Sequence, residues 1–120
     1  MDDRRPLIAV VGVCAAGKST LVAGLRAHGY NARQVLQEHS YVPYMWRRIT
    51  NPDLLIVLDC SIDTTRARRN DREFEAWILE AERHRLQHAR EHCDLYIATD
   101  DLTPAEILAQ TLALVRRSYS

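Results

Sequence analysis

Lysine is almost missing from this chain, which has one lysine, Lys18, against fifteen arginines among its 120 residues. The chain therefore keeps one compact ammonium group, at Lys18, although it uses the planar guanidinium of arginine elsewhere. This suggests that arginine does not replace lysine at this position. Sixteen acidic residues balance these bases, so the formal net charge is zero. A neutral chain gives no indication of nucleic-acid partners or of an anionic membrane surface, and we expect neither.

Cysteines and long apolar runs are also scarce. The three cysteines, Cys14, Cys60 and Cys93, are odd in number and lack metal-type spacing, which argues against a disulfide framework and favours a reduced, cytoplasmic setting. No apolar run approaches the roughly 18 residues of a membrane span. The first apolar run leads directly into a glycine motif, so we expect no signal peptide. The length predicts a single domain over 1–120.

The lone lysine lies in the segment Gly12–Ser19, which matches the pattern G-x-x-x-x-G-K-[ST] at every fixed position. In a phosphate-binding loop of this kind, backbone N–H groups converge on the phosphates of a nucleotide. The glycines permit the backbone angles and the close approach that this arrangement needs. The residues expected to hold the nucleotide are Gly12, Cys14, Ala15, Ala16, Gly17, Lys18, Ser19 and Thr20.

The residues around the motif provide the context that it needs. Residues 7–12 form an apolar, β-branched run of strand length, and 18–28 have the apolar spacing of a helix that ends near Gly29. Lys18 is predicted to reach the β- and γ-phosphates, and the Ser19 hydroxyl to ligate Mg²⁺. Thr20 is expected near the α-phosphate.

Strands and helices alternate along the rest of the chain. Segment 41–50 is predicted as a short helix or a loop interrupted by Pro43, and Thr103 to Glu106 form a capping box before the closing helix. The alternation predicts an α/β fold of three layers, with a parallel sheet of about four strands flanked by helices. The expected strands are 7–12, 32–37, 54–59 and 95–98, and the expected helices are 18–28, a region after Asp63, 73–92 and 104–117.

Two acids follow predicted strands, where ligands of parallel sheets bind. Asp59 ends a buried strand, as the metal-binding acid of such nucleotide sites does, although an acidic helix cap has the same appearance. Glu38 follows the second strand and is the rival acid, suited either to Mg²⁺ or to a general-base role on an acceptor hydroxyl. A loop glutamate without a catalytic role is the alternative for Glu38.

The densest run of arginines lies between residues 66 and 72. Phosphoryl transfer spreads negative charge over the transferred group, and a mobile arginine stabilises that charge. The alternative is that these arginines lie on a solvated helix face and form ion pairs with nearby acidic residues, which would give a similar sequence pattern. The run contains Arg66, Arg68, Arg69 and Arg72, of which Arg66, Arg69 and Arg72 are the catalytic candidates.

With these features placed, the chain resembles the P-loop kinases of nucleotides and small molecules, of the thymidylate and shikimate kinase types. Residues 54–66 are similar to their later core strand and following helix, 68–73 to their arginine-bearing lid, and 93–107 to their final strand and helix. The resemblance implies that Thr99 and Asp100 line the pocket for the base. The chain departs from the family in its short length and in the few residues between Glu38 and the strand at Leu54.

The expected function is therefore binding of Mg²⁺ and ATP and transfer of the γ-phosphoryl group to a small acceptor. GTP is disfavoured because the guanine signature N-K-x-D needs a lysine outside the motif, and the chain has none. The alternative is a nucleotide-binding switch or partner subunit with little or no phosphotransfer. The short acceptor region favours that alternative, and the arginine run favours the kinase.

Overall fold

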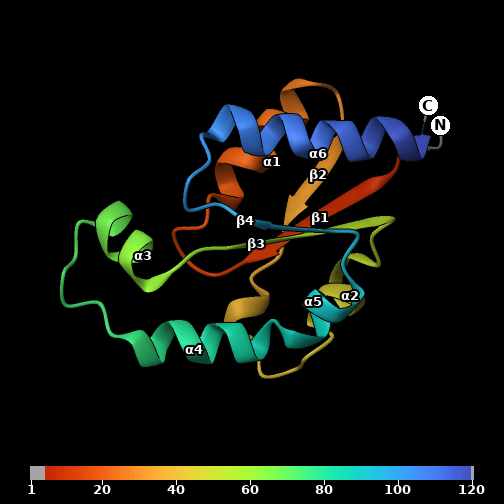
Figure 1. The fold of residues 1–120 in the computed structure, drawn as a ribbon. Coiled ribbons are helices and arrows are strands. Elements are labelled where there is room, and N and C mark those ends of the chain that lie inside the picture. The colour runs from red at the N-terminus through yellow and green to blue at the C-terminus, as the bar shows by residue number, and fades with distance from the viewer. Residues whose placement is uncertain (1–4, 120) are drawn as a thin grey trace.

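The structure is a computed structural model that describes residues 5–119. Its four strands form one parallel sheet in the order β2-β1-β3-β4 (Figure 1). Ile8 of β1 pairs with Leu54 of β3, and Leu58 of β3 pairs with Ile97 of β4. The strands are β1 (Leu7–Gly12), β2 (Asn31–Gln34), β3 (Leu54–Asp59) and β4 (Leu95–Ala98).

Helices cover both faces of the sheet. Figure 1 shows α1 (Lys18–Ala27) and α6 (Pro104–Tyr119) on one face, and α2 (Met45–Thr50), α4 (Ala76–Arg85) and α5 (Gln87–His92) on the other. The α/β class and the flanked four-strand parallel sheet expected from the alternating pattern are confirmed. Two further short elements lie beyond the carboxyl ends of strands: the single-turn 3₁₀ helix η1 (Gln37–His39) after β2, and α3 (Ile62–Arg69) after β3.

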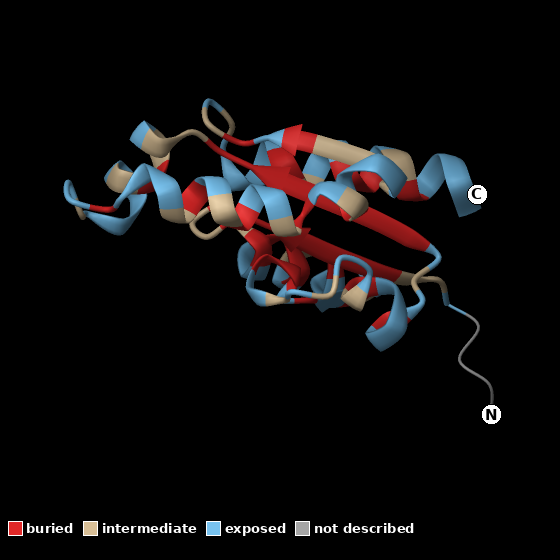
Figure 2. Cartoon of the chain, turned by 90° about the horizontal axis from the view of Figure 1, so that it is seen from below, coloured by how far each residue is buried: buried red, intermediate tan, exposed pale blue. Residues whose placement is uncertain are grey.

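The central strands are apolar because they are buried on both faces. Every residue of β3 is buried, and β1 is buried from Ile8 onward, as Figure 2 shows in red. Strand β2 lies at the edge of the sheet and exposes Arg33 and Gln34. Within residues 5–119, no helix combines the length and the apolar character needed to cross a membrane.

Two predicted boundaries differ from the structure. The second strand ends at Gln34, although the Val35 N–H still donates to the Val10 carbonyl, because the chain turns there into η1. The predicted helix 73–92 is two helices, α4 and α5, separated at Leu86, and α4 begins only at Ala76. Residues 71–74 form a turn instead, in which the N–H of the buried Phe74 donates to the Asp71 carbonyl, and Glu75 is extended, so α4 begins only after it.

The capping box that opens α6 is confirmed. The Thr103 N–H donates to Glu106 Oε1 at 2.9 Å, and the Glu106 N–H donates to Thr103 Oγ1 at 3.1 Å. Hydrogen bonds to the Glu106 carboxylate from the backbone N–H and the side chain of Thr103 lower the pKa of Glu106, because they favour its ionised form. Helix α6 then packs on α1, where the Leu108 side chain lies against Gly24.

Candidate functional site

The motif loop, which we define as Gly12–Ser19, joins the end of β1 to the start of α1. Gly12 has no room for a side chain, because a Cβ there would lie 2.4 Å from the carbonyl oxygen of Leu58. Gly17 has a φ of 101°, in the left-handed region that glycine adopts without strain. Ala15 also has a positive φ, 64°, so the loop holds a conformation that alanine adopts only when its surroundings require it.

The loop occupies the position in the sheet where ligands of parallel α/β proteins bind. Strand β1 has β2 on one side and β3 on the other, so the strand order reverses at β1. A crevice forms outside the carboxyl ends of strands at such a switch point. Among the described residues, no side chain caps the start of α1 and its first turn has no acid. The positive end of the helix dipole therefore faces the loop.

Lys18 is folded back across the loop and is 6 % exposed. Its ammonium donates to the carbonyls of Gly12 at 2.8 Å and Val13 at 3.1 Å, and to Glu38 Oε2 at 2.7 Å. This charge-assisted geometry gives the ammonium three acceptors. Lys18 and Glu38, which the sequence analysis named separately as candidates, are thus in direct contact.

Glu38 lies in η1, directly after β2, and is 2 % exposed. Only one of its two carboxylate oxygens is engaged: Oε2 accepts from Lys18, while the buried Oε1 has no hydrogen-bond partner among the described residues. The exposed His39 places Nε2 3.8 Å from Oε2. A buried carboxylate oxygen without a partner is costly, so Oε1 has the capacity to accept a hydrogen bond or to ligate a cation.

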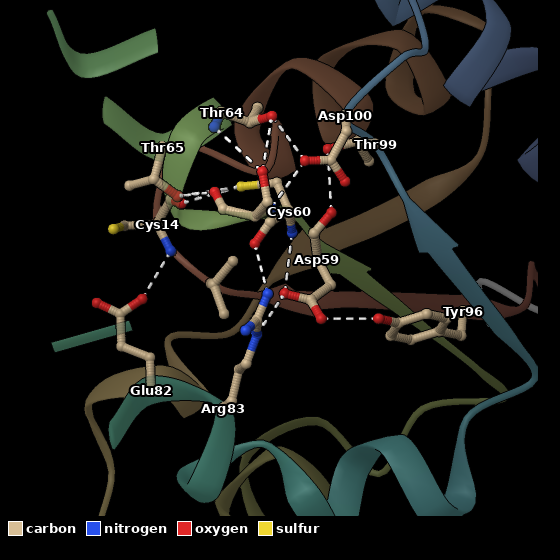
Figure 3. A network of polar contacts seen from close by, with 12 residues as sticks. Cys14, Asp59, Cys60, Thr64, Thr65, Glu82, Arg83, Tyr96, Thr99 and Asp100 are labelled. Carbon is tan, nitrogen blue, oxygen red and sulfur yellow. Dashed lines mark hydrogen bonds and ion pairs between the residues drawn. The ribbon is translucent and has the colours of Figure 1, made fainter. Parts of the chain in front are cut away.

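Asp59, the other candidate acid, is engaged elsewhere at the end of β3 (Figure 3). Its Oδ1 accepts from Arg83 Nε at 3.1 Å and from the Cys60 N–H at 2.9 Å. Its Oδ2 accepts from the Tyr96 hydroxyl at 2.7 Å. Burial and this bond to Asp59 raise the pKa of Tyr96 to about 12. Glu38, and not Asp59, is therefore the acid in contact with Lys18.

Two hollows open on either side of the motif loop. The first, of about 300 Å³, is formed by the loop, the start of α1, Arg68 and the apolar residues Leu102, Pro104 and Ile107. Thr20 lies in its wall. The second, of about 330 Å³, is lined by Cys14, Ala15, Gly17, Lys18, Ser19 and Gln34. The loop thus separates a largely apolar hollow from a more polar one, called the polar hollow below, which Lys18 lines.

Thr99 and Asp100 follow β4 and hold neighbouring segments together. Thr99 is buried, and its hydroxyl donates toward the carbonyls of Ala16 at 3.1 Å and Asp59 at 3.2 Å. Asp100 Oδ1 accepts from the Ser61 N–H at 2.8 Å and from the Thr64 hydroxyl at 2.6 Å (Figure 3). These bonds lower the pKa of Asp100 to about 2. Thr99 therefore supports the loop beside the apolar hollow, and Asp100 supports α3.

The candidate arginines of the run lie at the far end of α3 and in the turn after it. Arg66 Nε donates to the Phe74 carbonyl at 2.8 Å, and the Arg69 guanidinium lies 4.8 Å from the centre of the Phe74 ring. Arg72 is exposed. The structure brings a different member of the run, Arg68, to the motif loop.

Sequence reasoning did not select Arg68. Its Nη1 donates to the Ala15 carbonyl and to Thr99 Oγ1, both at 2.9 Å. Arg68 is four residues after Thr64, which contacts Asp100, so both side chains lie on the stripe of α3 that faces the end of β4. Helical spacing predicts that Thr64 and Arg68 share a stripe, but only the fold shows that this stripe reaches the motif loop.

Glu82 of α4 is the second residue that sequence reasoning missed. It is 3 % exposed, and its Oε1 accepts a hydrogen bond from the Cys14 N–H of the motif loop at 2.8 Å (Figure 3). Burial, followed by the proximity of Glu82, raises the pKa of the Cys14 thiol to about 11. The sequence signal was an acid on the apolar stripe that includes Leu79 and Leu86, both buried.

No protein-family model matches the chain, and no curated protein matches it significantly. Within residues 5–119, no group of three or more histidine, cysteine or acidic side chains is arranged to hold a metal ion by itself. What the fold and the site define is an α/β protein with a glycine loop at the switch point of its sheet. The loop carries a buried lysine–glutamate pair between two hollows.

Proposed function

We propose that this protein binds Mg²⁺ and ATP at the motif loop and transfers the γ-phosphoryl group to a small acceptor. The observation that carries the proposal is the Lys18 ammonium, held at the switch point of the sheet beside the half-satisfied carboxylate of Glu38. A lysine kept within reach of loop amides and a helix start suits the β- and γ-phosphates. The match of the loop to the phosphate-binding pattern supports the same assignment.

One hollow suits the base of the nucleotide, and the other suits its terminal phosphate together with the acceptor. The apolar hollow beside Leu102, Pro104 and Ile107 has the size and character to receive a nucleotide base. Arg68 lies at its edge, fixed by its bonds to the loop and to Thr99, and offers a guanidinium plane for stacking. The polar hollow on the other side of the loop would then receive the terminal phosphate and the acceptor.

The residues present fit a hydrated Mg²⁺ ion bound together with the nucleotide. Magnesium prefers one or two protein oxygen ligands together with phosphate oxygens and water. The Ser19 hydroxyl lines the polar hollow, and Glu38 has a buried oxygen that no described residue satisfies. When bound, the ion would neutralise charge on the phosphates during transfer. Asp59 would first have to release Arg83 and Tyr96, so Glu38 is the better ligand.

Glu38 also suits proton transfer from an acceptor hydroxyl. Binding of phosphates to Lys18 would compete with the bond between Lys18 Nζ and Glu38 Oε2 and would free that carboxylate. A general base must lie within hydrogen-bond reach of the proton that it removes, and Glu38 is the acid beside the lysine. Arg68 and the more distant Arg66, Arg69 and Arg72 are available to stabilise charge if the segment after α3 moves toward the loop.

Replacing Lys18 tests the proposal. Lys18→Ala should weaken binding of Mg·ATP by roughly 100-fold, because charge-assisted hydrogen bonds to phosphate are lost. The measurement is isothermal titration calorimetry. Since the single change leaves Glu38 buried without its partner, the matched variant Lys18→Ala with Glu38→Gln removes both charges and protects the fold. Undiminished affinity for Mg·ATP in a folded variant would refute the assignment.

Lys18→Arg should also weaken binding of Mg·ATP, because the planar guanidinium of arginine is broader than the ammonium group of lysine.

The second candidate is a nucleotide-binding switch or partner subunit without appreciable turnover. One feature favours it: only η1 and the six-residue helix α2 lie between β2 and β3, and α2 packs against the sheet. The segment between β2 and β3 is therefore too short to form a separate region that encloses an acceptor. A screen of small hydroxylated and phosphorylated acceptors for stimulated ADP release separates the two. Binding of ATP without any acceptor-stimulated release would favour the switch.

A further inference from the structure

Helix α4 places a carboxylate on the motif loop. The Glu82 side chain is 3 % exposed and lies on the stripe of α4 that also buries Leu79. Its Oε1 accepts the Cys14 N–H at 2.8 Å (Figure 3). An N–H group of a phosphate-binding loop is a donor for anions, so Glu82 occupies one of these donors with a negative charge of the protein's own.

The neighbouring residue fixes Glu82 at this position. Arg83 Nε donates to Asp59 Oδ1 at 3.1 Å, and Arg83 Nη2 donates to the Cys60 carbonyl at 2.8 Å. Asp59 is the last residue of β3 and Cys60 follows it, so these two bonds hold α4 against the carboxyl end of β3, beside the motif loop. The contact between Glu82 and Cys14 is therefore part of an anchored arrangement rather than an isolated surface contact.

The position of Cys14 indicates which phosphate Glu82 would meet. Cys14 lines the polar hollow together with Lys18 and Ser19, and it is not part of the apolar hollow suited to a base. A nucleotide with its base in the apolar hollow would extend its phosphates along the loop toward Lys18. Its terminal phosphate, and not the one next to the ribose, would therefore lie nearest to the amide that Glu82 holds.

We propose that Glu82 is a specificity-determining residue that lowers the affinity of the motif loop for a nucleoside triphosphate relative to the diphosphate. The inference rests on the proposed nucleotide function. Two like charges at one end of a poorly solvated loop repel each other, and the terminal phosphate also has to displace the carboxylate from the Cys14 N–H. A diphosphate, which ends farther from Cys14, meets less of this repulsion.

The test compares Mg·ATP and Mg·ADP by titration calorimetry in the wild type and in Glu82→Gln. Glutamine keeps the size and the accepting oxygen and removes only the charge. We expect the affinity of Glu82→Gln for Mg·ATP to rise about tenfold, and that for Mg·ADP to stay within about twofold. Glu80→Gln is the matched control, since it makes the same change at an exposed position of α4 and should alter neither affinity.

Each outcome decides the proposal. Equal affinities of wild type and Glu82→Gln for Mg·ATP, or an equal rise for both nucleotides, would overturn the role of Glu82 and leave the proposed function intact. Binding of Mg·ATP only by the variant would support both. Absence of binding by either protein would refute the proposed function, and the inference with it. If Glu82→Gln does not fold, Glu82→Asp is the second variant: its shorter side chain withdraws the carboxylate from the Cys14 N–H, so the affinity for Mg·ATP relative to Mg·ADP should rise, and an unchanged ratio would contradict the proposal.

Discussion

Gly12 is the residue at which the sheet and the motif loop constrain each other most directly. It is the last residue of β1, and it pairs with Leu58 in β3. Its missing side chain lets the Leu58 carbonyl approach, since a Cβ would lie 2.4 Å from that oxygen. The two nearest atoms belong to the backbone of a buried strand, which has little freedom to move.

Gly12→Ala should therefore destabilise the protein by about 3 kcal/mol, the upper end of the usual cost of overpacking a core. The measurement is equilibrium unfolding in urea. Gly29→Ala is the control, because Gly29 has a φ of 87° but a Cβ added there would meet no atom within 4 Å. That change should cost about 1 kcal/mol from backbone strain alone. Equal losses at the two positions would show that close packing at Gly12 is not the dominant effect.

The roles of single residues could be predicted where they depend on local pattern. The glycine spacing places Lys18 at the start of α1, and the structure confirms that placement. Arg68 and Glu82 were missed because their importance comes from contacts with Ala15 and Cys14, which lie 53 and 68 residues away in the chain. Local charge density does not indicate which side chain of a helix reaches a distant loop.

At the scale of elements, the start of α3 depends on a residue that follows the end of β4. Ser61 caps the helix by accepting the Thr64 N–H at 3.2 Å. Asp100 adds bonds from the Ser61 N–H and the Thr64 hydroxyl, so its carboxylate joins the β3–α3 connection to the segment after β4. A helix start satisfied by a distant carboxylate couples the stability of two elements.

This coupling predicts an acid-sensitive contribution to stability. Folding lowers the pKa of Asp100 from 3.8 to about 2, so the ionised carboxylate stabilises the folded state above about pH 4. That contribution is lost as the pH falls from about 4 toward 2. Asp100→Asn should lower the free energy of unfolding at pH 7 by up to about 1 kcal/mol, a value reduced by solvent screening.

Thermal unfolding measured from pH 7 to pH 2 checks this. The difference in unfolding temperature between the wild type and Asp100→Asn should shrink in the acid range. For Asp101→Asn, at the exposed neighbouring position, the difference from the wild type should not depend on pH in this way. A difference that stays constant over the whole range would contradict the role of the Asp100 charge.

Most elements could be predicted because their patterns are local and strong. β1, β3, β4 and α6 lie where apolar runs or the capping box indicated, and α1 ends within one residue of its predicted end. The interruption at Leu86 could not be predicted, since residues 73–92 have no glycine or proline to mark it. That break follows from packing: the buried Leu86 joins two helices that lie against different parts of the molecule.

At the scale of the whole molecule, α3 and the turn after it extend beyond the carboxyl ends of the strands (Figure 1). Thr65 is the one buried residue within α3, whereas all six residues of β3 are buried. The protein is accordingly long in one direction, with extents of 49 × 31 × 22 Å. Stability differs between parts of a structure according to how much apolar surface each part buries.

We therefore expect amides of residues 62–75 to exchange with solvent much faster than amides of β1 and β3. Hydrogen–deuterium exchange followed by mass spectrometry measures this directly. α6 is the internal comparison, since it is also a surface helix but buries Ile107, Thr111, Leu112 and Val115 and should exchange slowly. Protection of residues 62–75 equal to that of β3 would mean that this segment unfolds only with the whole protein.

The buried position of Lys18 has a consequence for the covalent chemistry of the molecule. Since the sequence has no other lysine, every other basic side chain apart from histidine is a guanidinium, which stays protonated over the range used for protein labelling. Reagents that acylate lysine amines therefore have a single side-chain target, which is 6 % exposed and bonded to Glu38 and two carbonyls. The rate at which that amine is acylated reports how often the loop releases it.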